Sequence, residues 1–371
     1  MTDLGITAGV LLTCYYVFLA WFFGRGLRRL SEVAGEVAPR VTVVCSARNE
    51  EKNLPGLLEC LSRQTYPREK TEFILVDDRS TDRTFGIIEE FMRTRPGAVA
   101  LRIPREEETP SPKKHALAKA IELASGELIL TTDADCLPGP DWVKEMVRYY
   151  DAGTGMVLGY APYRTDGIYD TLFHKLLALE YLAMGSVAAA TACTGHPSTC
   201  NGANLSFRKE AFEQVGGYGD GRKWLSGDDD LLMQRIHSRT GSQIRFAASP
   251  LAAVPNNPPL NIGEFVRQRI RFSSKHLAYP PAMIAVLSGV YLFYVSLLIL
   301  TLAAFFAQTL APYCVAVWLA KIAAELSFLA PFQRRMEKRR LLKYYFLLAP
   351  FHLPYVVFFP VLGQVIRPRW K

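Results

Sequence analysis

The sequence predicts an α/β domain with a doubly wound, mostly parallel sheet, joined to α-helical transmembrane segments. Short apolar runs alternate with helix-like segments and end in polar turns, which is typical of such a sheet. Half of the 371 residues are hydrophobic, and long uncharged runs lie near both ends. We therefore divide the chain into a membrane anchor (1–24), an α/β domain (40–262), an amphipathic interface helix (263–280) and a C-terminal membrane region (281–371).

The N-terminal apolar run covers residues 5–23 and is long enough to cross about 30 Å as a helix. Arg25, Arg28 and Arg29 follow it at once. The run has no basic region before it and no small-residue cleavage site after it. We expect an anchor rather than a cleaved signal peptide.

Three further apolar segments follow the α/β domain, at residues 282–307, 311–329 and 341–366. Prolines interrupt the last segment, which leaves open whether it spans the membrane or is re-entrant. The positive-inside rule places the basic residues at 25–29 and 334–340 in the cytoplasm. This predicts an integral protein of a bacterial inner membrane with its α/β domain in the cytoplasm.

The second of these segments carries Lys321 and Glu325, spaced four residues apart on one helix face. Two interpretations stay open. The two side chains pair inside a helix bundle, or they lie near a membrane surface and extend toward water.

The net charge of +8 lies largely in segments that flank the membrane. It favours anionic lipid headgroups or a diphosphate as partners. No basic element interleaved with aromatic residues appears, so we expect no nucleic-acid partner. The seven cysteines are scattered without a Cys-x-x-Cys pair, which argues against disulfides and against a zinc cluster.

The first two predicted strands cover residues 41–46 and 73–76, and a helix-like segment follows each, the second over residues 84–93. The second strand runs into the acidic turn 77–82. Because ligands of open α/β sheets bind at the carboxyl ends of the strands, this arrangement predicts a nucleotide site there. The sequence lacks a glycine-rich phosphate loop. We therefore expect a metal ion to help to hold a diphosphate.

Asp133 and Asp135 follow the apolar run 126–132 and end another predicted central strand. An Asp-x-Asp pair alone is more often a solvated turn, but two hard oxygen donors at this position suit Mg²⁺ or Mn²⁺ that carries a diphosphate. Lys113 opens a helix whose amino end could face phosphate. The alternative is an ordinary solvated helix start.

Later segments leave several roles open. Residues 172–184 form an apolar helix that belongs either to the core or to a membrane interface. Residues 202–208 are strand-like. The acidic run 228–230 begins a helix, where it either complements the helix dipole or supplies a general base whose pKa is raised by its neighbours. The basic run 267–272 either meets lipid headgroups or reaches a diphosphate.

Taken in order, these motifs resemble the inverting family 2 glycosyltransferases of GT-A fold in their membrane-integrated form. The matching segments are Ser46-Ala47-Arg48-Asn49-Glu50-Glu51, Val76-Asp77-Asp78-Arg79-Ser80-Thr81-Asp82, Lys113, Asp133-Ala134-Asp135, Gly227-Asp228-Asp229 and Gln268-Arg269-Ile270-Arg271-Phe272. The chain departs from the family pattern at Arg79, where glycine is usual, and at Phe272, where tryptophan is usual. The second change argues against close similarity to processive polysaccharide synthases.

The resemblance implies roles for individual residues. Catalysis would fall to Asp229 as base, with Asp228 beside it, and metal binding to Asp135 and Asp133. The residues expected to bind the nucleotide-sugar are Ala47, Arg48, Glu50, Asp78, Lys113, Asp133, Asp135, Gln268, Arg271 and Phe272. Those expected to contact the acceptor are Asn204, Asp230 and Trp224.

We therefore expect a divalent-metal-dependent hexosyltransferase that moves a sugar, with inversion, from a UDP-linked donor to a lipid or lipid-like hydroxyl at the membrane. Two alternatives stay open, a subunit of a processive polysaccharide synthase and an inactive membrane scaffold of the same fold. A transporter is disfavoured because most of the chain forms the α/β domain. The sequence leaves the oligomeric state, the sugar and the acceptor open.

Overall fold

The structure is a computed structural model of the whole chain. The residues that it describes are 2–30, 38–95, 97–104, 109–219, 227–275 and 278–366.

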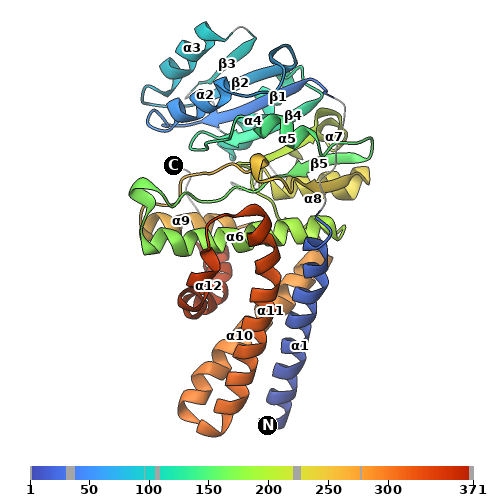
Figure 1. Cartoon of the computed structure of the whole chain (residues 1–371), viewed down its shortest axis with the longest axis vertical. Helices are drawn as coiled ribbons and strands as arrows, with labels where there is room; N and C mark the ends of the chain where they lie inside the picture. The colour runs from blue at the N-terminus through green and yellow to red at the C-terminus, as the bar shows by residue number, and fades with distance from the viewer. Residues whose placement is uncertain are drawn as a thin grey trace.

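A seven-stranded sheet with the order β3-β2-β1-β4-β6-β5-β7 forms the upper half of the molecule (Figure 1). Its first four strands are parallel, β6 is antiparallel to both neighbours, and β5 and β7 are parallel to each other. The predicted mostly parallel α/β sheet is confirmed. The strands are β1 (Val41–Ala47), β2 (Thr71–Asp78), β3 (Ala98–Ile103), β4 (Leu128–Asp133), β5 (Thr154–Leu158), β6 (Leu205–Arg208) and β7 (Gln243–Phe246).

Helices cover both faces of this sheet. On one face, α2 buries four leucines at helical spacing in a core that also contains α5. On the other face, α4 buries Ala116, Leu117, Ala120 and Ile121 in a core shared with α6 (Leu172–Cys193). Covering both faces explains why the central strands are uniformly apolar. The domain's smaller helices are α2 (Leu54–Ser62), α3 (Thr84–Thr94), α4 (Pro112–Leu123), α5 (Trp142–Val147), α7 (Lys209–Gln214) and α8 (Asp230–Thr240).

Strand register brings the acidic turns to one edge. Ser46 of β1 pairs with Asp133 of β4, and Ala47 pairs with Asp77 of β2. The three strands therefore end side by side, and the turns after β1, β2 and β4 share the carboxyl edge of the sheet. This is the edge at which open α/β sheets bind ligands.

Two helices, α6 (Leu172–Cys193) and α9 (Ile262–Ser273), lie crosswise beneath the sheet domain (Figure 1). Most of the apolar stretch of α6 is buried in the protein. Its residues join the core that also holds α4 and the sheet. The open question about residues 172–184 is thus answered in favour of a core helix, and its lower side borders the apolar part of the molecule.

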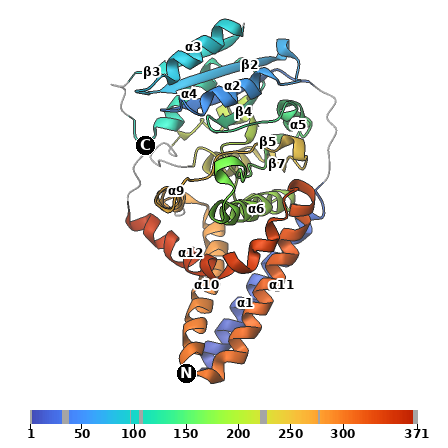
Figure 2. The same cartoon turned by 60° about the vertical axis from the view of Figure 1, so that its left-hand side comes forward.

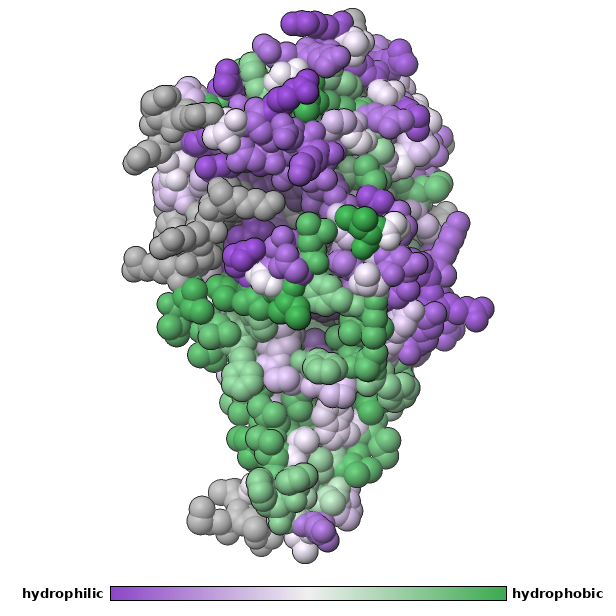
Figure 3. Space-filling model, turned by 90° about the vertical axis from the view of Figure 1, so that its left-hand side faces the viewer, coloured by the Kyte–Doolittle hydropathy of each residue, from purple (hydrophilic) through white to green (hydrophobic). Residues whose placement is uncertain are grey.

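Below this layer, α1 (Thr2–Leu27), α10 (Pro281–Phe306) and α11 (Ala311–Met336) run downward as a bundle (Figures 1 and 2). The short link at Gln308–Leu310 lies at the end farthest from the sheet. Exposed residues of this half are mostly hydrophobic, whereas the sheet domain is mostly hydrophilic (Figure 3). Among the described residues, five helices, including α6, are long and apolar enough to cross a membrane.

The last helix, α12 (Tyr345–Val365), lies across the bundle and contains Pro350, Pro354 and Pro360 (Figure 2). It packs against α9, where Gln364 Nε2 donates to the Ser273 carbonyl at 2.9 Å. Its course along the boundary between the two halves favours a helix that stays at the interface over one that spans.

Within the bundle, Lys321 and Glu325 of α11 form an ion pair of 2.8 Å, and the Lys321 side chain is fully buried. Of the two arrangements that the sequence left open, the structure has the internal pair.

Candidate active site

The centre of the carboxyl edge is an ion cluster around Lys113. Pro112 begins α4, where its missing N–H costs no hydrogen bond, and the next residue directs its ammonium toward the sheet edge. Lys113 Nζ lies 2.8 Å from Asp133 Oδ1 and 2.9 Å from Asp228 Oδ2. Burial acts against the charge of Lys113, yet the two carboxylates raise its pKa well above the usual value. The structure thus brings together three residues that are distant in sequence.

Asp229 adjoins this cluster at the start of α8. Its Oδ1 accepts from the Asp230 backbone N–H at 2.8 Å, and its Oδ2 accepts from Gly202 N–H at 3.1 Å. Lys275 Nζ lies 3.4 Å from Asp229 and 2.7 Å from Asp230. Asp230 also accepts from the Tyr279 hydroxyl at 2.5 Å. Lys275 therefore links the acidic run to the segment that enters α10.

The sequence suggested that the neighbouring carboxylates raise the pKa of Asp229. In the structure the pKa of Asp229 is lowered instead. Burial acts to raise it, but the Lys275 ammonium and the hydrogen bond from Asp230 lower the pKa well below its usual range. Burial instead raises the pKa of Asp230 to about 6. Asp229 is consequently an ionised carboxylate at neutral pH, able to accept a proton, and its 17 % exposed side chain is more accessible than that of Asp230.

The turns after β1 and β2 are bonded to each other. Asn49, at a φ of 55°, donates its N–H to Ser80 Oγ at 3.0 Å, and Glu50 N–H donates to Thr84 Oγ1 at 2.9 Å. Asp78 is buried and pairs with Arg79, whose φ of 61° is a left-handed conformation. Burial raises the pKa of Asp78, against the opposing guanidinium of Arg79.

Gln268 is connected to the same edge through two bridged segments. Cys136, next to Asp135, forms a backbone bridge with Asn256, which also bridges Tyr163. The Tyr163 hydroxyl donates to Gln268 Oε1 at 3.0 Å. The other two predicted residues of α9 lie together, with the Arg271 guanidinium 5.4 Å from the Phe272 ring centre.

Asp133 and Asp135 meet the needs of a divalent cation that brings its other ligands with it. Mg²⁺ sites commonly use one or two carboxylates, with the remaining positions filled by water and substrate phosphates. Among the described residues, no group of three or more His, Cys, Asp or Glu side chains gathers as a closed cage. Asp133 ends β4 with a partly exposed carboxylate, and Asp135 follows two residues later with an intermediate exposure, a donor set that fits a metal shared with a diphosphate.

The structure does not fit the prediction that Asn204 contacts the acceptor. Its side chain is fully buried, its Oδ1 accepts from Trp142 Nε1 at 2.9 Å, and its Nδ2 donates to the carbonyls of Tyr160 and Ala252, each at 2.8 Å. These bonds hold the sheet to the segments beside it and do not fit a contact with an acceptor. Trp224, also predicted for the acceptor, lies outside the described residues.

Sequence reasoning missed Lys114, Lys275 and Tyr279. Lys114 is 1 % exposed beside the acidic run, and burial lowers its pKa to about 8. Lys275 follows Asp229 by 46 residues and Tyr279 follows Asp230 by 49, and only the folded chain brings these partners together. The one signal in the sequence was a lysine directly before an apolar segment, which by itself predicts a contact with headgroups.

Comparisons with known proteins indicate the family to which the sheet domain is similar. Residues 42–216 match the family model described as Glycosyl transferase family 2. The chain is 27 % identical over 259 residues to the probable glycosyltransferase YdaM of Bacillus subtilis, covering 68 % of this chain and 58 % of that protein. It is 30 % identical over 128 residues to a beta-monoglucosyldiacylglycerol synthase of Nostoc, covering 34 % of this chain and 27 % of the synthase.

A solved structure extends the likeness to nearly the whole chain. The mannosyltransferase PcManGT of Pyrobaculum calidifontis, in complex with GDP-Man and Mn²⁺, superimposes with a TM-score of 0.62. The match covers 97 % of this chain and 99 % of that one, at 21 % identity. At this identity the likeness shows the fold, which is the expected GT-A fold with its helical additions.

Proposed function

The chain carries a family 2 glycosyltransferase domain, and on that premise we propose that it moves a sugar from a nucleotide-sugar to a hydroxyl of a lipid or lipid-like acceptor at a membrane surface. The observation that supports this proposal most directly is the cluster of Lys113, Asp133, Asp228 and Asp229 at the carboxyl edge of the sheet. The cluster combines a cation for phosphate with carboxylates for a metal and for a proton.

The donor lies along the edge formed by β1, β2 and β4. In this proposal Glu50 and Asp78 face the base and ribose, with Ala47 and Arg48 in the same turn. Lys113 supplies positive charge to the diphosphate, and Arg271 reaches it from α9. Mg²⁺ or Mn²⁺ held by Asp133 and Asp135 would neutralise part of the diphosphate's charge when bound. We propose a UDP-linked donor, as the resemblance implies.

Asp229 acts as the general base. It takes the proton of the acceptor hydroxyl, whose oxygen attacks the anomeric carbon from the face opposite the diphosphate. The new carbon–oxygen bond forms as the bond to the diphosphate breaks, and the electron pair leaves with the diphosphate, which Lys113 stabilises. Displacement from the opposite face inverts the sugar. Proton removal by a positioned base contributes typically about 10²–10⁴-fold to the rate.

The acceptor class is supported by the surroundings of the base. Lys275, bonded to Asp229, lies between α9 and the apolar helix α10. The base therefore sits close to the apolar half of the molecule, where a lipid hydroxyl would arrive from a bilayer. One relative is named for synthesis of a glucosyldiacylglycerol, a product of this class.

Purified protein in detergent is the material for the test. It is incubated with Mg²⁺ or Mn²⁺, a panel of labelled UDP- and GDP-sugars and a membrane lipid extract, and mass spectrometry identifies labelled products. We expect one nucleotide-sugar to yield a lipid that carries a single added sugar. A labelled polymer would instead indicate a processive synthase. Intact protein that neither transfers nor hydrolyses any donor would indicate a scaffold.

A further inference from the structure

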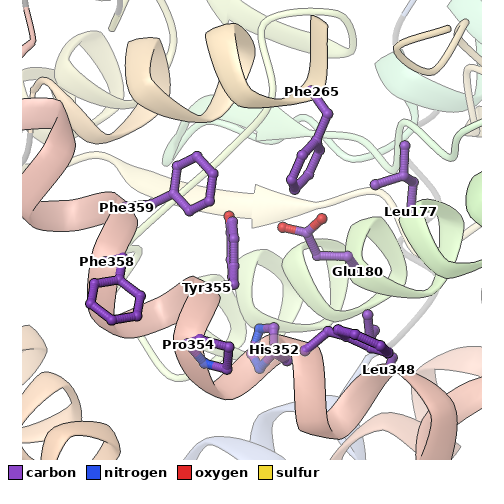
Figure 4. Close-up of a pocket in the computed structure, with 10 residues that line it drawn as sticks. Leu177, Glu180, Phe265, Leu348, His352, Pro354, Tyr355, Phe358 and Phe359 are labelled. Carbon is purple, nitrogen blue, oxygen red and sulfur yellow. The ribbon is translucent and has the colours of Figure 1, made fainter. Parts of the chain in front are cut away.

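We infer that a groove between α6, α9 and α12 binds the hydrocarbon chain of the acceptor, an inference that rests on the proposed lipid acceptor. The groove has a volume of about 330 Å³ and is lined by ten residues of these three helices (Figure 4). Leu177 comes from α6, Phe265 from α9, and Leu348, Phe351 and Phe358 come from α12. This volume falls within the range of small-molecule sites, about 300–1,000 Å³.

The chemistry of the lining suits an apolar chain. Six of its ten lining residues are leucine or phenylalanine. Its one acidic side chain, Glu180, is ion-paired at 2.7 Å with Arg269. Aromatic rings surround that guanidinium, with the ring centres of Phe265 and Tyr181 at 5.0 and 5.5 Å. With its charge neutralised in this way, the groove offers a hydrocarbon-like surface, and burial of CH₂ groups supplies the affinity.

The position of the groove indicates where such a chain comes from. Its outer wall, α12, lies between the crosswise helices and the bundle of α1, α10 and α11 (Figure 2). Phe346, Phe351 and Phe358 of this helix are all more than half exposed. An apolar surface of this kind is stable in contact with lipid rather than water. The groove is therefore continuous with the surface that would face bilayer hydrocarbon.

Helix α9 joins the groove to the proposed base. Phe265 lines the groove near the start of α9, and Ser273 ends the helix about 12 Å farther along its axis, at 1.5 Å per residue. Two residues later Lys275 contacts Asp229. A lipid lying along α9 would present its hydroxyl to Asp229 while its tail fills the groove. A short-chain acceptor could present the same hydroxyl to Asp229, but its tail would not reach the groove.

The test compares two acceptors that share one headgroup, 1-O-hexadecylglycerol and 1-O-butylglycerol. Leu348→Trp fills the groove, and Leu347→Trp is the matched control, because Leu347 is exposed and lies outside the lining. For the unaltered protein we expect kcat/KM to be at least tenfold higher with the hexadecyl acceptor. Leu348→Trp should reduce this preference to within about twofold, whereas Leu347→Trp should keep it. A Tm in detergent equal to that of the unaltered protein shows that each variant is folded.

The inference would be overturned if Leu348→Trp and Leu347→Trp showed the same preference for the hexadecyl acceptor. It would also be overturned if the unaltered protein showed no such preference. Crosslinking with a photoreactive hexadecylglycerol provides a readout that does not depend on turnover. We expect label on α6, α9 and α12 peptides, lost in Leu348→Trp and kept in Leu347→Trp. If nucleotide-sugar is hydrolysed but no lipid is glycosylated, the proposed acceptor is wrong. The crosslinks still decide whether the groove binds a hydrocarbon chain, and label elsewhere would overturn that claim.

Discussion

Two clusters of charged side chains differ in how completely their hydrogen bonds are satisfied. In the helix bundle, Glu325 accepts from Tyr16 and Tyr294 on one oxygen and from Lys321 and Tyr345 on the other. These four bonds match the capacity of a carboxylate. At the sheet edge, Lys113 bridges two carboxylates that remain partly exposed, and Asp133 keeps 34 % of its side chain in contact with solvent.

The difference separates a structural cluster from a binding site. A saturated carboxylate that joins α1, α10, α11 and the start of α12 holds helices together, although a charge at membrane depth is usually suspected of function. An unsaturated cluster at a sheet edge retains capacity for a ligand. The comparison predicts that changes in the bundle affect stability and that changes at the edge affect catalysis.

The largest expected effect on stability follows from Glu325→Gln. This change leaves the buried Lys321 ammonium without its counter-charge, and breaking a buried pair costs about 3–5 kcal/mol. We expect a lower Tm in detergent, with kcat per folded molecule unchanged. Thermal unfolding monitored by fluorescence and activity at low temperature measure the two quantities. A fall in kcat without a fall in Tm would contradict the structural assignment.

Lys113→Met should produce the next largest effect, on catalysis. Bonds to charged groups contribute about 1.5–3 kcal/mol, so we expect kcat/KM to fall by about 10- to 150-fold. The loss should appear for the nucleotide-sugar and be partly recovered by Lys113→Arg, which keeps the charge. Steady-state kinetics at varied donor concentration provide the measurement. An unchanged donor KM and kcat would remove Lys113 from the donor site.

A smaller effect is expected from Lys275→Met, on pH dependence. Without this ammonium the pKa of Asp229 rises toward its ordinary value, so the base is protonated at higher pH than before. The acidic limb of kcat/KM against pH should therefore move upward, by on the order of one pH unit. Lys275→Arg retains the charge and should keep the original limb. Identical pH profiles for the two variants would show that Lys275 does not tune Asp229.

The strands and the carboxylates at their ends could be predicted from the sequence, because they depend on local patterns of residues. Strand-ending carboxylates such as Asp133 were recognisable because apolar runs and turn residues are local, and parallel topology brings such ends to one edge. The bonds that decide roles are not local. Asn204 was expected to contact the acceptor, yet its side chain is hydrogen-bonded to Trp142 and to two backbone carbonyls. The influence of Lys275 on Asp229 required the tertiary fold.

The assignment of Asp229 as base is the central claim, and single-turnover transfer by Asp229→Asn tests it most directly. The asparagine keeps the shape of the side chain and can accept one of its two backbone N–H bonds, from Gly202 or from Asp230, but it cannot take the acceptor proton. With saturating nucleotide-sugar and lipid, we expect donor binding to be retained and the transfer rate to fall by about 10²–10⁴-fold. Transfer at the rate of the unaltered enzyme would contradict the account and move the base elsewhere in the acidic run.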